Sequence, residues 1–306
     1  MKKTLFQNSD GYVHALMLLA IILAASSFPV GAAITNRLPP EILMFLRFIL
    51  ASVLFAPFVF IKYGIIPPSR RALLNYNILS IPLVVFFWCM FESLRYTSIL
   101  NTGALYTTVP AITAVFALLI NREKTGKIRS IGLFLGTIGA LWIVFRGNLD
   151  ALLGLEINYG DFIFLVGCLF LGSYNPLVKR SHQGEPMEVL TFWVLLSGSV
   201  WLLIVSLKGI THVYWHNIEK DVYFGIIYLS LFSTLITFFV INFSTVQIGA
   251  TKVAAYGFLT PVFIIIMSIL FGMEPFEVVT IPGLLLIVAA MILIQRDGAN
   301  KNINST

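Results

Sequence analysis

The sequence predicts an all-α integral membrane protein in which ten transmembrane helices form two inverted five-helix repeats. Three observations predict this fold: the composition, an internal repeat and the positions of the basic residues. Of the 306 residues, 58% are hydrophobic and 11% are charged, and the mean hydropathy is +0.91. A soluble domain carries about 25% charged residues. We therefore expect the lipid bilayer to surround most of the chain.

The internal repeat has a constant offset of 151 residues, which aligns residues 91–143 with residues 242–294. Each copy has an apolar run, a short polar joint, a second apolar run with a central proline, then a glutamate and a third run. Identical residues at matching positions include the pairs Ser93 and Ser244, Ala104 and Ala255, Pro110 and Pro261, and Glu123 and Glu274. A half-length repeat in a strongly apolar chain is typical of secondary transporters.

Ten apolar segments come close to the roughly 20 residues that a helix needs to cross a bilayer. The first belongs to an uncharged run of 26 residues, which exceeds the about 7–15 residues of a signal-peptide core. The fifth and sixth are short, and glycines and acidic residues mark the joint between them. We assign residues 1–150 to the first repeat and 151–306 to the second. The segments are 12–36, 41–61, 72–94, 99–121, 128–146, 160–178, 187–207, 222–245, 250–272 and 276–295.

The basic residues indicate the orientation, because Lys and Arg collect in short cytoplasmic loops. With the N-terminus inside, fourteen of the twenty basic residues fall in inner segments and five in outer segments. Residues 121–129 are basic, whereas the matching residues 272–277 carry two glutamates and no Lys or Arg. We therefore expect both termini in the cytoplasm and a second repeat inserted in the opposite sense. The net charge of +6 reflects this orientation and does not point to nucleic acid.

Short motifs for cofactor, metal or catalytic chemistry are missing from the sequence. The two cysteines lie in apolar runs, so neither a disulfide framework nor a zinc site is expected. No Walker A loop, HExxH pair or nucleophile elbow occurs. We expect no cofactor and no enzymatic activity, and an intramembrane enzyme or a channel remain the alternatives to a carrier.

Several local motifs occur in one order along the whole chain. They are Leu38-Pro39-Pro40 with Phe45-Leu46-Arg47-Phe48, Leu94-Arg95-Tyr96-Thr97-Ser98, Arg122-Glu123-Lys124, the glycines Gly132, Gly136 and Gly139, Gly160-Asp161, Gly249-Ala250 and Glu274-Pro275. In this order the chain resembles the drug/metabolite transporter superfamily, and its EamA-type transporters in particular. The resemblance implies secondary transport or exchange of small molecules, from amino acids to nucleotides and vitamins. One segment departs from it, since Ala25-Ser26-Ser27-Phe28 stands where the family usually has a Trp-Gly pair.

Prolines in the fourth and ninth segments are candidate hinges. Pro110 and Pro261 occupy matching positions, and proline removes a backbone donor and loosens the preceding turn. Static kinks are the alternative, because neighbouring helices can satisfy the freed carbonyl.

Polar side chains near these prolines are candidates for substrate contacts. Tyr106 lies one turn before Pro110, and Tyr256 lies near Pro261. Their hydroxyls need partners in lipid, either across helices or in a wet cavity. The polar neighbours we include are Asn101, Tyr174, Asn175 and Asn242.

Charged residues within or near the spans are the remaining candidates. Trp88, Glu92 and Arg95 share a helix face, as an outer gate or as an interfacial ion pair beside an anchoring tryptophan. Arg47 lies deep in the second span and could bind a carboxylate or phosphate or hold the two halves together.

Three further ionisable residues complete this set. His14 is a candidate for proton coupling because histidine titrates near neutral pH. Glu123 and Glu274 end their helices, where an acid opposes the helix dipole, and we interpret them as gate or hinge locks.

The sequence also leads to expectations about the oligomeric state, the substrate and the location. Gly132 and Gly136 form a GxxxG pair that favours packing within one chain and also allows a homodimer. For the small-molecule substrate we favour export of an amino acid or related compound, with uptake of a nucleotide-like metabolite or vitamin as the alternative. The expected location is a bacterial inner membrane.

Overall fold

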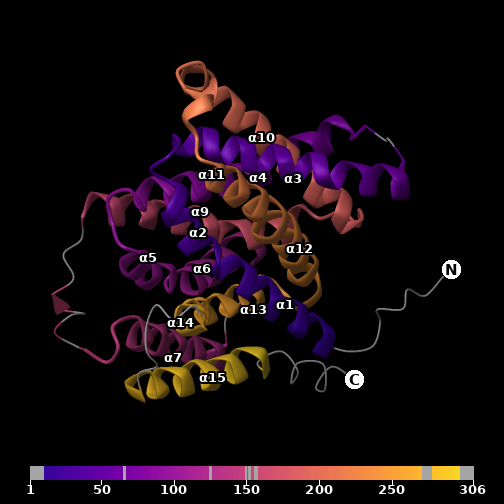
Figure 1. Cartoon of the computed structure of the whole chain (residues 1–306). Helices are drawn as coiled ribbons and strands as arrows, with labels where there is room; N and C mark the ends of the chain where they lie inside the picture. Colours follow the sequence, from indigo (N-terminus) through magenta and orange to yellow (C-terminus); the bar gives the residue numbers. More distant parts are fainter. Residues whose placement is uncertain are drawn as a thin grey trace.

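Every regular element in the described part of the chain is a helix (Figure 1). The computed structural model describes residues 10–64, 67–123, 126–148, 150, 153–154, 158–270 and 278–296. The first repeat contains α1 (Asp10–Ala25), α2 (Ser27–Ile34), α3 (Pro40–Tyr63), α4 (Arg70–Ser93), α5 (Ile99–Tyr106), α6 (Val109–Asn121) and α7 (Lys127–Val144).

The second repeat contains more irregular helical segments than the first. Its elements are α9 (Tyr159–Ser181), α10 (Met187–Ile210), the 3-10 turn η1 (Trp215–Asn217), α11 (Lys220–Tyr228), the π-helix η2 (Leu229–Ile236), α12 (Thr237–Ile248), α13 (Ala250–Ala255), the 3-10 turn η3 (Tyr256–Leu259), α14 (Thr260–Leu270), the 3-10 turn η4 (Val278–Thr280) and α15 (Ile281–Arg296).

The predicted all-helical membrane fold is confirmed. Among the described residues, nine helical stretches have the length and apolar composition to cross a membrane. A shorter apolar helix, Ala250–Ile264, lies at the ninth predicted position. Adjacent elements combine into single candidate spans, which are α1 with α2, α5 with α6, and α11 with η2 and α12.

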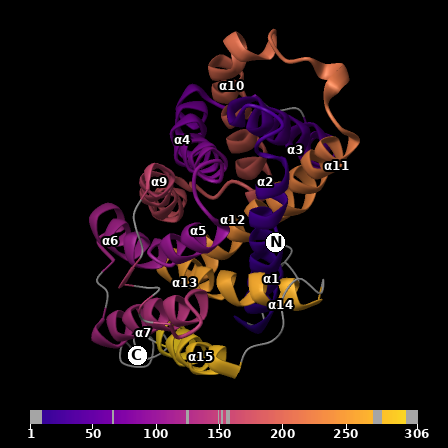
Figure 2. The ribbon, with the colours of Figure 1, turned by 60° about the vertical axis from the view of Figure 1, so that its left-hand side comes forward.

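The helices are arranged in layers that both views show. Helices α7 and α15 lie together at one edge, and α3, α4 and α10 lie at the opposite edge (Figures 1 and 2). Helices α1, α12 and α13 lie between them. Helix α1 begins and α15 ends on the same side of the bundle, on the right of Figure 1. We call this the terminal side, and the other end of the bundle the opposite side.

The packing of α7 against α15 shows the inverted relation of the repeats. Gly132 lies against Ala290, whose carbonyl oxygen would be 3.1 Å from an added Cβ. Seven residues further along α7, Gly139 lies against Gly283, whose carbonyl oxygen would be 2.8 Å from an added Cβ. Contacts therefore run forward along α7 and backward along α15, so the two matching helices are antiparallel. Gly136 contacts Phe258, so both glycines of the GxxxG pair pack within this chain.

Replacing Gly139 by alanine is expected to destabilise the fold by about 1–3 kcal/mol, because the added methyl group meets backbone that cannot move aside alone. Gly103→Ala is the matched control, since this buried helical glycine has only one side-chain atom near its added Cβ, at 3.9 Å. The measurement is the thermal unfolding midpoint in detergent. Equal midpoints for the two variants would contradict the close α7–α15 contact.

Candidate functional site

Two spans are interrupted at matching positions of the repeats. Between α5 and α6, the amides of Thr107 and Thr108 donate to carbonyls three residues back, at 3.1 and 3.0 Å, and Pro110 follows in the first turn of α6. In the second copy the 3-10 turn η3 precedes Thr260 and Pro261. Proline lacks the amide that a continuous helix would use and crowds the preceding turn. The same local cause therefore interrupts both helices.

The two interruptions meet close to the pseudo-two-fold axis that relates the repeats. Gly257 is the repeat mate of Tyr106, and an added Cβ at Gly257 would lie 3.3 Å from Cε1 of Tyr106. Two mates touch each other only near the axis that exchanges them. Transporters with inverted repeats bind substrate near such an axis, at the ends of broken helices. This geometry places Tyr106 at the centre of the candidate site.

Three phenylalanines form a cluster with Tyr106, and two of them contact its ring. The Tyr106 ring lies edge-on to Phe28 at 5.6 Å between centroids and tilted against Phe86 at 6.3 Å. Phe164 contacts Phe28 at 6.3 Å and Phe86 at 6.1 Å. We call these four residues, from α2, α4, α5 and α9, the central aromatic cluster. Such rings bind apolar groups through their faces and cations through their quadrupoles.

The Tyr106 hydroxyl is the polar group of this cluster. Its side chain is half-buried, whereas Phe164 is fully buried. Within the described residues the Tyr106 hydroxyl makes no hydrogen bond. A tyrosine hydroxyl inside a membrane protein normally has a partner, so this hydroxyl is available to a ligand.

Tyr256 and His14 are brought together by the fold. The Tyr256 hydroxyl pairs with Nδ1 of His14, and the Tyr256 side chain is 3% exposed. His14 lies on α1, and Tyr256 is the first residue of η3. The predicted proton-coupling and cavity residues therefore join the first span to the interruption in the ninth.

Tyr174 and Asn242 contact each other in a buried network. The Tyr174 hydroxyl donates to Oδ1 of Asn242 at 2.7 Å, and Nδ2 of Asn242 donates to the Thr191 hydroxyl at 2.9 Å. These residues link α9, α12 and α10, and all three are buried. Asn175, the next residue of α9, is half-buried.

Arg47 is fully buried and joins the two repeats. Its Nε donates to the Thr234 hydroxyl, and its Nη2 donates to the carbonyl and hydroxyl oxygens of Ser233 at 3.3 and 3.2 Å. Its guanidinium carbon lies 4.2 Å from the centroid of Phe87. Of the two predicted roles, the contact between halves is present in the structure.

Two cavities lie away from the central aromatic cluster. One of about 170 Å³ is lined by Tyr76, Leu79 and Glu185, and one of about 320 Å³ by Tyr63, Tyr76 and Trp193. The smaller lies between the first turns of α4 and the end of α9, and the larger between the end of α3 and the starts of α4 and α10. Among the described residues, no group of three His, Cys, Asp or Glu side chains could hold a metal ion.

Comparison with known proteins identifies a family for this chain. The model of the EamA-like transporter family matches residues 12–145 and 158–296. The chain belongs to the EamA-like transporter family. The two matched ranges correspond to the five spans of each half, and the predicted resemblance is confirmed.

Curated relatives of this EamA-family chain are themselves named as transporters. The uncharacterized transporter YyaM of Bacillus subtilis is 28% identical over 225 residues, covering 73% of each chain. An uncharacterized transporter of Archaeoglobus fulgidus is 27% identical over 257 residues, covering 83% of this chain and 87% of the relative. The uncharacterized inner membrane transporter YedA of Escherichia coli is 22% identical over 282 residues, covering 92% and 89%.

A solved structure supports the fold. A protein crystal structure superposes with a TM-score of 0.74 over 94% of this chain and 98% of that chain, at 14% sequence identity. At this identity the likeness shows the fold alone.

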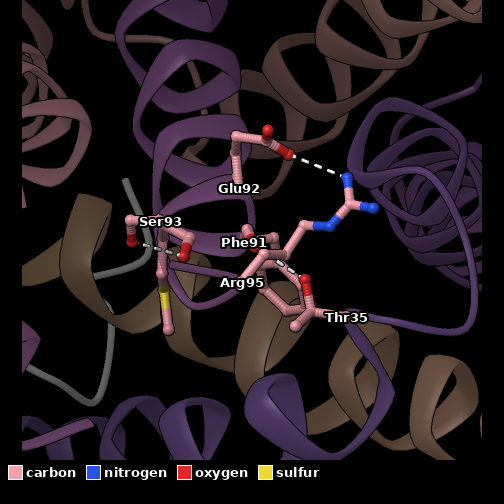
Figure 3. Close-up of polar contacts among 6 residues, drawn as sticks. Thr35, Phe91, Glu92, Ser93 and Arg95 are labelled. Atoms are coloured by element: carbon pink, nitrogen blue, oxygen red, sulfur yellow. Dashed lines mark hydrogen bonds and ion pairs between the residues drawn. The ribbon is translucent and has the colours of Figure 1, made fainter. Parts of the chain in front are cut away.

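The candidate gate of this EamA-family chain lies at the end of α4. Arg95 pairs with Glu92 at 3.1 Å, and their side chains are 37% and 15% exposed (Figure 3). Beside this pair, the Thr35 hydroxyl donates to the Phe91 carbonyl at 2.6 Å and ties the end of α2 to α4. Trp88, one turn earlier on α4, is half-buried.

Glu123 has a basic partner on the terminal side. It pairs with Lys179 and so connects the end of α6 to the last turns of α9. A positive φ of 55° at Arg122 turns the chain at this point. Its repeat mate Glu274 lies outside the described residues.

Asp161 belongs to the Gly160-Asp161 motif, but it is not among the predicted site residues, and its buried carboxylate is the acceptor of a hydrogen-bond network. It accepts hydrogen bonds from the Thr97 hydroxyl at 2.5 Å, from Nδ2 of Asn101 at 3.1 Å and from the Asn158 amide at 3.0 Å. The Asn158 side chain in turn accepts from the Asp161 amide, which completes a capping box at the start of α9. Asn101, predicted as a cavity neighbour, therefore binds the first turn of the second repeat.

Proposed function

We propose that this membrane transporter is a secondary carrier that moves a small polar metabolite by alternating access around Tyr106. The contact of Tyr106 with its repeat mate Gly257 carries the proposal. A site on the axis between two inverted repeats can open to either side when the repeats exchange conformations. The interruptions at Pro110 and Pro261 lie at this site and supply two places where the helices can bend.

An amino acid or related compound fits the central aromatic cluster best, and we favour its export. Phe28, Phe86 and Phe164 offer apolar faces to a side chain, and rings of this kind also attract an ammonium group. The Tyr106 hydroxyl can donate to or accept from the substrate's polar part.

The proposed location is a bacterial inner membrane with both termini in the cytoplasm. The excess of basic residues in alternate loops and the shared side of α1 and α15 support this orientation. The name of the relative YedA supports the membrane. A C-terminal reporter that is active only outside the cytoplasm would contradict the orientation.

Ionic and polar pairs at the two sides are the proposed locks of the cycle. Glu123 with Lys179 closes the terminal side, and Glu92 with Arg95 lies at the opposite side. His14 with Tyr256 is the proposed proton-sensitive contact. A His14→Gln variant whose flux still follows an imposed pH gradient would contradict that role.

The proposal is tested by counterflow in proteoliposomes preloaded with an unlabelled amino-acid pool. Accelerated entry of one labelled amino acid would show a carrier and name its substrate. Tyr106→Phe removes one hydroxyl and is expected to weaken apparent affinity by up to about tenfold, the value of one hydrogen bond. Tyr214→Phe is the control, because Tyr214 is 81% exposed. Unchanged affinity in Tyr106→Phe would show that its hydroxyl does not contact substrate.

A further inference from the structure

The guanidinium of Arg47 is buried without a counter-charge. Its side chain is 0% exposed, and no carboxylate of the described residues lies within ion-pair distance. A cation in the membrane interior is costly and is normally paired with an acid or placed in water. Two hydroxyls, one carbonyl and the Phe87 ring lower this cost without neutralising the charge.

One nitrogen of the Arg47 guanidinium, Nη1, has no hydrogen-bond partner among the described residues. Nε and Nη2 are held by Thr234 and Ser233, while Nη1 is buried without a hydrogen-bond partner. Both hydroxyls accept from Arg47, and neither donates to another described residue, so each keeps its own O–H for a further acceptor. Arg47 and the hydroxyls on its Nε and Nη2 therefore supply unused hydrogen-bond donors and one positive charge. This is the chemistry that binds an oxyanion.

The segment that accepts hydrogen bonds from Arg47 differs between the two repeats. Ser233 and Thr234 lie in the π-helix η2, and π-helical turns occur frequently at functional sites. The corresponding span of the first repeat is α4, a single α-helix over Arg70–Ser93 without a π-helical segment. In α10, the helix of the second repeat that corresponds to α3, Val194 takes the position of Arg47, because each residue lies seven positions after the start of its helix. A scaffold contact would be expected in both repeats, whereas a ligand needs one copy.

We propose that Nη1 of Arg47, together with the hydroxyls of Ser233 and Thr234, receives the carboxylate of the transported metabolite. This inference rests on the proposed carrier function and names its substrate class as carboxylate-bearing. One carboxylate neutralises one guanidinium. A phosphate monoester carries about −1.5 to −2 charges at neutral pH and would leave surplus negative charge in the membrane.

The position of Arg47 connects this anion site to the central aromatic cluster. Phe87, which covers the guanidinium, contacts Phe86 at 5.0 Å, and Phe86 contacts Tyr106 at 6.3 Å. The carboxylate therefore reaches Arg47 when these two rings turn aside. The remainder of the substrate then faces Tyr106.

Binding is tested first without transport, using sodium acetate as the probe. The thermal midpoint of the purified chain in nanodiscs is compared in acetate, chloride and phosphate at equal ionic strength. Acetate is expected to raise the midpoint of the wild type and of Arg70→Gln, an exposed control, but not that of Arg47→Gln. Thr234→Val and Ser233→Ala, which keep the charge, are expected to need about tenfold more acetate, the loss of one hydrogen bond. These two variants carry the test if Arg47→Gln does not fold.

Other results would contradict this proposal. An equal acetate shift in Arg47→Gln, no change in the hydroxyl variants, or a larger shift with phosphate would overturn the carboxylate site.

Counterflow of L-leucine and L-phenylalanine against their C-terminal amides separates the two proposals. Equal transport of acid and amide by the wild type would overturn the carboxylate site and leave the carrier standing. An Arg47-dependent acetate shift without counterflow would support the anion site and count against the proposed carriage of amino acids.

Discussion

Replacing both Pro110 and Pro261 by alanine is expected to slow transport by about tenfold or more while leaving thermal stability unchanged or higher. Alanine restores an amide donor and removes the ring that crowds the preceding turn. Helix α5 can then continue into α6, and the turn η3 can become α-helical. A carrier that bends at these points would have to break the new hydrogen bonds in each cycle. Each single substitution is expected to cause part of the loss.

The measurement is the counterflow rate at saturating substrate, together with the thermal midpoint of each variant. Pro57→Ala serves as the control, because Pro57 is an exposed proline inside α3 and lies away from both interruptions. A double variant with wild-type turnover would show that the interruptions are static kinks. A lower midpoint combined with lower turnover would instead indicate damage to the fold.

The ten spans and the positions of the two interruptions could be predicted from the sequence for simple physical reasons. A bilayer imposes a minimum length on each apolar helix, and proline imposes a local break wherever it occurs. The repeat then indicates which breaks are paired, as at Pro110 and Pro261. These features depend on local sequence and on one offset, so no tertiary information is needed to find them.

The composition of the central aromatic cluster could not be predicted in the same way. The chain has 26 phenylalanines, and apolar side chains are equally suited to lipid and to the protein interior of a membrane span. Only the fold brings Phe28, Phe86 and Phe164 into one cluster with Tyr106. The regular spacing of side chains along a helix indicates which of them share a face, but not what that face contacts.

The hydrogen-bond partners of the polar residues also could not be predicted from the sequence. Tyr174 and Asn242 are both recognisable as polar groups in apolar spans, but their hydrogen bond joins residues 68 positions apart. Arg47 is recognisable as a buried charge, but the π-helix that holds it is not indicated by the sequence of residues 229–236. Asp161 has one partner that the local sequence indicates and two that it does not. Its capping pattern with Asn158 is local, whereas its contacts with Thr97 and Asn101 come from the preceding repeat.

Asp161→Ala is expected to lower the free energy of unfolding by about 3 kcal/mol, the largest stability effect we predict for a polar substitution. The change removes the capping box of α9 and leaves the donors of Thr97, Asn101 and Asn158 without their acceptor. Loss of a cap costs about 1 kcal/mol, and each buried donor left unpaired adds about 1–3 kcal/mol unless water reaches it.

Unfolding in mixed micelles by denaturant or heat measures this loss, and Asp221→Ala is the matched control. Asp221 also lies in the first turn of a helix, α11, but its side chain is exposed. Asp161→Asn should lose less, because one oxygen acceptor remains. Equal stability of the Asp161→Ala and Asp221→Ala variants would show that the network adds nothing beyond helix capping.

A large loss confined to Asp161→Ala would mean that the α4–α5 joint and the start of α9 form one unit. Movement between the repeats on the opposite side would then have to carry this unit as a rigid body and bend elsewhere, at the interruptions beside Tyr106.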